Sequence, residues 1–292
     1  MFGIARSLRI LTCASVCLLT SLLPLGRAAT QRPNAAAIVK SSVSVNDADW
    51  RAQPAYSHDE RDVNVKIGQD GKESGKQEKT YRVMMIDGSP YSKLIAVNGE
   101  PLSAAQKSQE AARLKSEIAR RSQQSKSARS ARIQKYQKER AEEHLLMNEM
   151  VKAFTFKLSG EETVGGHPCY VLDATPNPNY RPSVEKARVL TGMKGRLWIE
   201  KGSYHWAKVH AEVFTPVEFG FFVAKVRPGT QFELLQTPLA DGAWLPSRFS
   251  QSINARVLGL YSIRNRTDEY YSAYQRESSS NKPGLGSPGA SR

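Results

Sequence analysis

Apolar and polar side chains alternate along several stretches of the chain, a pattern typical of β-strands with one buried face. The stretch from Phe154 to Ser159 and the series 248–257 both show it. Between residues 63 and 103, shorter runs are separated by Asp-Gly and Asn-Gly pairs, which favour tight hairpin turns. The pattern predicts successive antiparallel strands in one curved sheet or open barrel. The apolar faces of the two clearest strands are formed by Phe154, Phe156, Leu158, Phe249, Ile253 and Val257.

The strand pattern is interrupted from Ser103 to about Val151, where neither Pro nor Gly occurs. Ser103 and Gln106 have the spacing of a capping box, which satisfies the free amides at a helix start. This composition and the capping box therefore predict that residues 103–151 form a long helix or a helical pair inserted between strands. Its middle, RRSQQSKSARSAR, has almost no apolar face and is expected to project into solvent or to fray. An Ala-rich stretch from residue 35 predicts one earlier helix that ends before Trp50.

The first 28 residues predict a cleaved signal peptide. Arg6 and Arg9 precede an apolar run, residues 10–25, and this run is shorter than the roughly 20 residues that a membrane-spanning helix needs. We therefore expect a periplasmic or secreted protein with a single domain, residues 29–277. The tail, residues 278–292, has too few apolar side chains to form a core and is expected to be disordered.

Positive charge is concentrated in the predicted helical insertion. The chain has a formal net charge of +14, and between Lys107 and Arg140 eleven Lys and Arg stand against three Glu, which gives 11 − 3 = +8. Such a stretch is either a solvated helical insertion or a contact surface for an envelope protein or an anionic membrane. Nucleic acid is not expected, because only Tyr136 is available there for base stacking. The candidate contact residues are Arg120, Arg121, Lys126, Arg129, Arg132 and Lys135.

His167 and Cys169 stand two residues apart in HPCYVLDATP, so on a strand their side chains share one face, about 7 Å apart. A nucleophilic pair needs hydrogen-bond contact and a third group that orients the imidazole, and no oxyanion-hole motif lies nearby. We therefore expect Cys169 to be a small buried residue and expect no catalytic residue. No spacing of Cys, His or acidic residues fits a metal site, so neither a metal nor a cofactor is expected.

The apolar segment FGFFVAKV, residues 219–226, has little alternation. One interpretation is a buried strand or short helix at the edge of the sheet. The other is a lid over an apolar cavity, formed by Phe219, Phe221 and Phe222, because cavities of this kind are lined by such side chains.

Three stretches carry a resemblance to a known family: GEETVGGHPCYVLDATP, KGRLWIEKGSYHWAKVHAEV and DGAWLPSRF, followed by the closing YYSAYQR. Over about residues 50–276 the chain resembles the LolA-like family, the outer-membrane lipoprotein-sorting proteins. TYRVMMIDGSPYSKLIAVNGEPLS, with its charged helix, looks like an uncharacterised bacterial secreted subgroup. The resemblance implies an α+β fold, mostly antiparallel β: an open half β-barrel of LolA type with covering helices, here with a long basic helical insertion.

A fold of this type implies an apolar cavity, which in the carriers takes acyl chains. We therefore expect a monomeric, non-enzymatic periplasmic carrier or binding protein for a lipid or lipoprotein acyl chain. The alternative hypothesis is a cell-envelope interaction or sensor module that docks through the basic helix.

Overall fold

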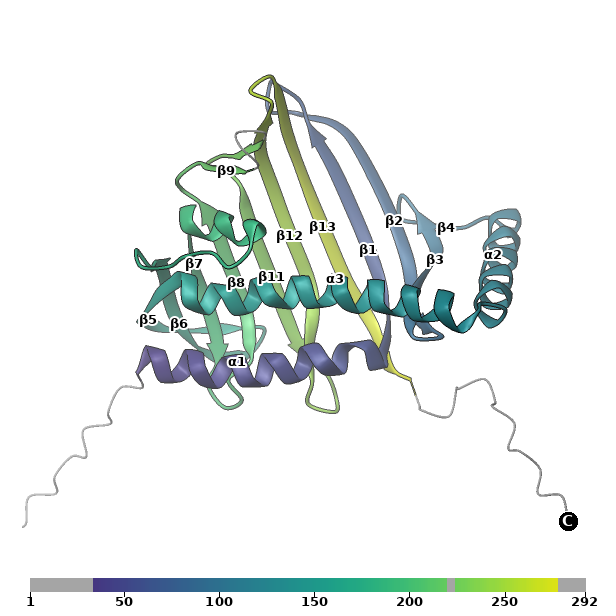
Figure 1. The fold of residues 1–292 in the computed structure, drawn as a ribbon, viewed down its shortest axis with the longest axis horizontal. Coiled ribbons are helices and arrows are strands. Elements are labelled where there is room, and N and C mark those ends of the chain that lie inside the picture. Colours follow the sequence, from purple (N-terminus) through teal and green to yellow (C-terminus); the bar gives the residue numbers. More distant parts are fainter. Residues whose placement is uncertain (1–33, 220–223, 278–292) are drawn as a thin grey trace, which may run out of the picture. The chain divides into compact units, whose positions relative to one another are not determined.

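The computed structural model describes residues 34–219 and 224–277, which form one large sheet with helices on one side (Figure 1). The predicted signal peptide, the tail 278–292, Phe221 and Phe222 lie outside the described residues. The helices are α1 (Ala35–Ala52), α2 (Ala104–Ser122) and α3 (Lys126–Ala153), with 3₁₀ segments η1 (Gln53–Ala55) and η2 (Glu185–Gly192). The strands are β1 (Tyr56–Ile67), β2 (Glu73–Ile86), β3 (Ser89–Val97), β4 (Glu100–Pro101), β5 (Phe154–Val164), β6 (His167–Pro176), β7 (Met193–Glu200), β8 (Trp206–Val213), β9 (Val217–Phe219), β10 (Ala224–Val226), β11 (Gln231–Pro238), β12 (Trp244–Val257) and β13 (Tyr261–Arg276).

Every strand pair in the described residues is antiparallel, and 13 strands form one sheet. The main strand order is β4-β3-β2-β1-β13-β12-β11-β8-β7-β6-β5, while β9 and β10 form a short hairpin that pairs with one end of β12. Strands β4 and β5 are the two edges of this order, so the sheet stays open. The predicted open, mostly antiparallel fold with covering helices is confirmed.

Hairpin turns lie where the sequence predicts them. Asp87 and Gly88 between β2 and β3 have φ of 49° and 85°, and Asn98 and Gly99 between β3 and β4 have φ of 52° and 82°. These left-handed conformations are the ones that Asp, Asn and Gly adopt at least cost. Gly88 has a second reason to lack a side chain, because an added Cβ would lie 2.9 Å from Cδ1 of Ile133 on α3.

The basic insertion is a pair of helices, one of the two predicted forms. Ser103 and Gln106 form the predicted capping box at the start of α2, and Ser125 caps α3 by accepting a hydrogen bond from the amide of Ala128. The expectation that the middle of the insertion projects into solvent is wrong for Arg121, which is 7 % exposed. Its guanidinium donates to the backbone carbonyls of the β2–β3 hairpin, a polar contact that no apolar periodicity reveals.

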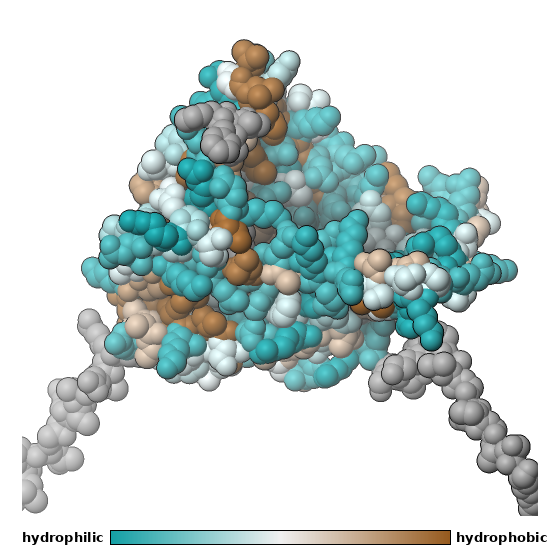
Figure 2. Space-filling model, viewed as in Figure 1, coloured by the Kyte–Doolittle hydropathy of each residue, from teal (hydrophilic) through white to brown (hydrophobic). Residues whose placement is uncertain are grey.

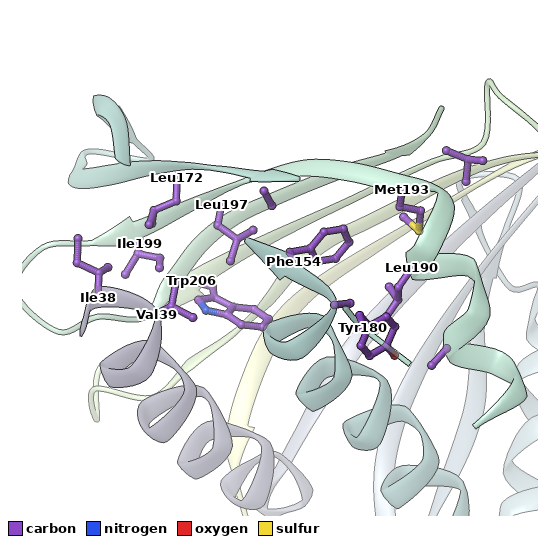
Figure 3. Close-up of a cluster of buried hydrophobic side chains, with 14 residues drawn as sticks. Ile38, Val39, Phe154, Leu172, Tyr180, Leu190, Met193, Leu197, Ile199 and Trp206 are labelled. Atoms are coloured by element: carbon purple, nitrogen blue, oxygen red, sulfur yellow. The ribbon is translucent and has the colours of Figure 1, made fainter. Parts of the chain in front are cut away.

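Helices α1 and α3 both lie across the same side of the sheet, which we call the inner face (Figure 1). Residues from α1, the sheet and the C-terminal end of α3 form the main core (Figure 3). Ile38 and Val39 of α1 pack near Ile199 and Trp206, and the indole Nε1 of Trp206 donates to Oγ of Ser42 over 3.1 Å. Helix α1 continues past Trp50 to Ala52, slightly beyond the predicted end.

None of the helices in the described part of the chain combines the length and the hydropathy needed to cross a lipid bilayer.

Candidate functional site

One row of directly opposed residues crosses the inner face from β5 to β2. Opposed residues on neighbouring strands point to the same side of a sheet, so the strand register gives the order of side chains along the row. Six apolar residues come first and three charged ones follow, so the inner face has an apolar half and a polar half. In order from β5, the row is Leu158, Leu172, Leu197, Val209, Leu234, Phe249, Glu269, Asp62 and Lys79.

The apolar half contains a narrow cavity beneath α1 and the end of α3. Its volume open to the centre of a water molecule is about 20 Å³, and a single water needs roughly 10–15 Å³ on this measure. The space in the cavity is therefore far smaller than an alkyl chain. Its walls include Val39, Met150, Val151, Phe154, Phe156, Ala174, Leu197, Trp206 and Val209.

The structure places the six predicted lining residues at two separate locations. Phe154 and Phe156 line the cavity, and Leu158 packs against the core around it. Phe249, Ile253 and Val257 lie on the inner face of β12, outside the walls of the cavity. Strand alternation alone cannot separate the two groups, because both are on the same face of the same sheet.

The wall residues that the sequence prediction missed come from both strands and helices. Val209 alternates with polar neighbours in WAKVHAEVF, so its position on the buried face could be read from the sequence, whereas Leu197 stands between Arg196 and Trp198 in RLWIEK and could not. Val39 and Met150 belong to helices, and their position depends on how α1 and α3 cross the sheet. The sequence contains no local signal for that crossing.

A few polar contacts hold α1 over the cavity. The carboxylate of Asp49 lies 3.1 Å from Nε2 of His205, directly before β8, and that of Asp47 lies 2.9 Å from Nε2 of His144 on α3. The ring of His144 also stacks on Trp50, with centroids 4.0 Å apart. Helix α1 is thus tied to both the sheet and α3 by side chains at its C-terminal half.

Glu149 fixes the C-terminal end of α3, which forms one wall of the cavity. It is 1 % exposed, and its carboxylate accepts hydrogen bonds from the Tyr180 hydroxyl at 2.7 Å and from Lys152 Nζ at 3.0 Å. The hydrogen bond from Tyr180 and the one from Lys152 lower the pKa of Glu149 to about 2. Met150 and Val151, which follow directly, are wall residues of the cavity.

Several carboxylates lie close together on the polar half of the inner face. Glu60 and Asp62 lie on one side of β1, opposite Tyr271 and Glu269 of β13. Burial, followed by the charge of Glu60, raises the pKa of Asp62 to about 7. Burial also raises the pKa of Glu269. Crowded carboxylates in a partly desolvated position disfavour full ionisation, so this half of the face is suited to polar contacts and not to an alkyl chain.

We expect Asp62→Asn to raise the free energy of unfolding at pH 8 by about 1 kcal/mol. The effect is this small because solvent screens the charge of a partly exposed carboxylate. A carboxyl whose pKa is raised from 3.8 to about 7 on folding binds more protons in the folded state, so stability falls as pH rises through that window. Urea unfolding of both proteins at pH 4 and pH 8 measures the effect. If the free energy of unfolding fell by the same amount from pH 4 to pH 8 in the wild type and in Asp62→Asn, the prediction would be contradicted.

Cys169 is packed on the opposite face of the sheet, with Val171, Trp198, Ala207 and Trp244. It is fully buried, and its thiol donates to the backbone carbonyl of His167 at 3.3 Å. Burial raises the pKa of the thiol to about 11. The imidazole of His167 instead packs edge-on against Trp244. The thiol is therefore protonated near neutral pH, which is unsuited to nucleophilic chemistry.

Most of the cations proposed for partner contact are paired within the chain. Arg120 and Arg121 both bond to Glu117, and Arg129 and Arg132 both bond to Asp87. Lys135 lies 3.9 Å from Glu139. Among the six, Lys126 alone has no ion-pair partner in the described residues. Arg121 and Arg132 are also largely covered, because they tie the helix pair to the β2–β3 hairpin.

Phe219, the one described residue of the three lid candidates, is the last residue of β9. Its strand partner is Ala224 of β10, which in turn pairs with Val257 of β12. Phe219 therefore belongs to a strand at the end of the sheet.

No protein-family model matches the sequence, and a search of curated proteins finds no match. Among solved structures, the chain is similar to a putative outer membrane lipoprotein-sorting protein domain from Vibrio parahaemolyticus (10 % identity, 85 % of this chain and 95 % of that chain, TM-score 0.32). It is also similar to a LolA superfamily protein from Nitrosomonas europaea (11 % identity, 84 % of this chain and 94 % of that chain, TM-score 0.30). A third similar structure is the MucA/MucB complex of Pseudomonas aeruginosa (10 % identity, 85 % of this chain and 100 % of that chain, TM-score 0.23). At these identities and TM-scores, the likeness reaches no further than the fold.

Proposed function

We propose that this protein is a non-enzymatic periplasmic binding protein that holds a lipid or lipoprotein acyl chain against the apolar half of the inner face. The observation that carries this proposal is the run of six consecutive apolar residues in one cross-strand row, from Leu158 to Phe249. Helices α1 and α3 would cover the chain from the other side. The proposed contacts are Phe154, Phe156 and Leu158 at one end and Phe249, Ile253 and Val257 at the other.

The size of the driving force agrees with such a role. Burying an alkyl chain contributes about 0.8 kcal/mol for each methylene, so a dozen methylenes supply roughly 10 kcal/mol before the unfavourable terms of binding. One of those terms is conformational, because a cavity of about 20 Å³ has to widen before a chain can enter. Moving α1 would break the contacts of Asp47 and Asp49 with two histidines. The proposal therefore requires α1 or α3 to shift on binding.

The alternative function, docking on a partner through the basic helix pair, has less support. Five of the six proposed contact cations lie within ion-pair distance of carboxylates of the same chain. A partner would have to compete with those carboxylates, and two of the cations are largely covered.

We expect Phe249→Gln to weaken the binding of a fluorescent C16 fatty acid about tenfold, because a large apolar contact is replaced by an amide. Ser252→Gln is the matched control, since Ser252 is on the same strand but points to the opposite side of the sheet. The dissociation constants come from equilibrium titrations. Equal affinities in the wild type and both variants would contradict a binding site on the inner face.

A further inference from the structure

The hairpin between β12 and β13 ends in an exposed apolar tip. Four large apolar side chains stand close together there: Leu258 is 60 % exposed, Leu260 78 %, Tyr261 66 % and Ile263 43 %. We call these four residues the hairpin tip. Figure 2 shows hydrophobic residues at the end of the molecule where Figure 1 places the hairpin of β12 and β13. An apolar cluster this exposed on a projecting element marks an interaction surface.

The turn itself is unusual. Leu258 has φ of 51°, a left-handed conformation that is rare for a bulky side chain. At the β2–β3 and β3–β4 hairpins, the corresponding position is occupied by Asp87 and Asn98, which adopt it more easily. The β12–β13 turn therefore keeps an exposed leucine where a polar residue would be better suited to both the backbone and the solvent.

Cations flank the tip without nearby carboxylates. Arg256 is exposed, and no carboxylate of the described residues lies within ion-pair distance of it or of Arg264. The Arg264 guanidinium donates instead to the backbone carbonyl of Gln69. Arg256 precedes Leu258 by two residues, about 7 Å along a strand. Long cationic side chains at that distance reach the phosphates of a bilayer when an apolar tip enters it.

From this arrangement we infer that the hairpin tip docks the protein on a membrane surface that contains anionic phospholipids. A bilayer matches both the apolar end and the unpaired arginines behind it. A protein partner fits less well, because a specific protein interface needs about 800 Å² on each side, more than the end of one hairpin presents. Docking does not depend on whether the inner face binds an acyl chain.

Apolar side chains also continue from the hairpin tip onto the inner face of the sheet. Two successive cross-strand rows behind it are entirely apolar: Phe219, Ala224, Val257 and Tyr261, then Val217, Val226, Ala255 and Ile263. Val226 packs against the main core. If the proposed function holds, a lipid chain that leaves the bilayer at the tip would meet apolar side chains from there to the core.

Binding of the full chain to vesicles tests the inference. We expect the double variant Leu258→Ser/Leu260→Ser to bind at least about tenfold more weakly than the wild type to vesicles of phosphatidylethanolamine and phosphatidylglycerol. Arg256→Gln/Arg264→Gln is expected to weaken binding to these vesicles but not to neutral phosphatidylcholine vesicles. The controls are Ile118→Ser, which removes a 48 % exposed apolar residue from α2, and Lys126→Gln/Lys135→Gln, which lowers the charge elsewhere. Equal loss in controls and tip variants would overturn the inference.

A depth measurement separates insertion from attraction by overall positive charge. The fluorescence of an added tryptophan in Leu260→Trp should be quenched by phospholipids with brominated acyl chains, while that in Ile118→Trp should not. Bound protein with no quenching at position 260 would overturn the inference. So would a wild-type chain that self-associates in sedimentation and becomes monomeric when Leu258 and Leu260 are both serine, because the tip would then be an interface between copies.

Discussion

Replacing Arg121 with alanine is expected to lower the free energy of unfolding by about 3 kcal/mol. Its guanidinium donates to the carbonyl oxygens of Ile86, Ser89 and Pro90 at 2.6, 2.9 and 3.1 Å. Removing it deprives three carbonyl oxygens of this donor in a region with little access to water, and it leaves Arg120 as the remaining ion-pair partner of Glu117. Urea unfolding followed by circular dichroism measures the change.

Arg120→Ala is the matched control, because Arg120 bonds to the same carboxylate of Glu117 but is 56 % exposed and reaches no backbone carbonyl of the hairpin. Surface ion pairs of this kind contribute little to stability. We expect a much larger loss of stability for Arg121→Ala than for Arg120→Ala. Similar losses would mean that the contacts with the β2–β3 hairpin do not hold the helix pair in place.

The second large effect is expected at Glu149, where Glu149→Ala should cost about 2–3 kcal/mol at neutral pH. The substitution leaves the buried hydroxyl of Tyr180 without an acceptor, and it removes the acceptor of the Ser183 amide at 3.3 Å. Because the next residues form a wall of the cavity, we also expect the end of α3 to become more mobile. Hydrogen exchange of the amides of residues 147–153 measures that mobility.

The pH dependence of this contribution has a defined sign. The folded-state pKa of Glu149 is about 2, below the ordinary value of 4.5. A lowered carboxyl pKa stabilises the protein fully above the unfolded value and progressively less as pH falls towards the folded value. The difference in stability between the wild type and Glu149→Ala should therefore shrink between pH 4.5 and pH 2. Glu142→Gln, which changes an exposed carboxylate on the same helix, is the control. A difference that stays constant down to pH 2 would contradict the role of the charge.

Local patterns predict the sheet because strand alternation and turn chemistry are local properties. The alternation around Phe154 and Phe249, the Asp87-Gly88 turn and the capping box at Ser103 are all present as predicted. Each depends on residues within a few positions of one another, so one sequence is sufficient to find it.

Long-range contacts were not predictable in the same way. Arg121 sits in a stretch with no apolar face, and its burial depends on carbonyl groups of a hairpin more than 30 residues away. The division of the inner face into apolar and polar halves depends on which strands become neighbours. Phe249 and Glu269 are adjacent across β12 and β13, and Asp62 lies beside Glu269 only because β1 pairs with β13. These are properties of strand order, which alternation does not contain.

The small size of the cavity means that binding an alkyl chain requires a conformational change. The cavity has room for a water molecule or two, so an alkyl chain enters only if the cavity widens. The chemistry of the row from Leu158 to Phe249 supports the proposal, and a shift of α1 or α3 would supply the space. The polar half, with Glu60, Asp62 and Glu269, would then limit how far along the face an alkyl chain extends.

Native mass spectrometry of the protein purified from its own host shows whether the apolar half of the inner face carries a lipid. We expect part of the protein to carry the additional mass of an acyl lipid, which is released by organic extraction and is reduced in Phe249→Gln but not in Ser252→Gln. A protein that always has the mass of the bare polypeptide, and that yields no lipid on extraction, would contradict the claim that the apolar half of the inner face binds an acyl chain.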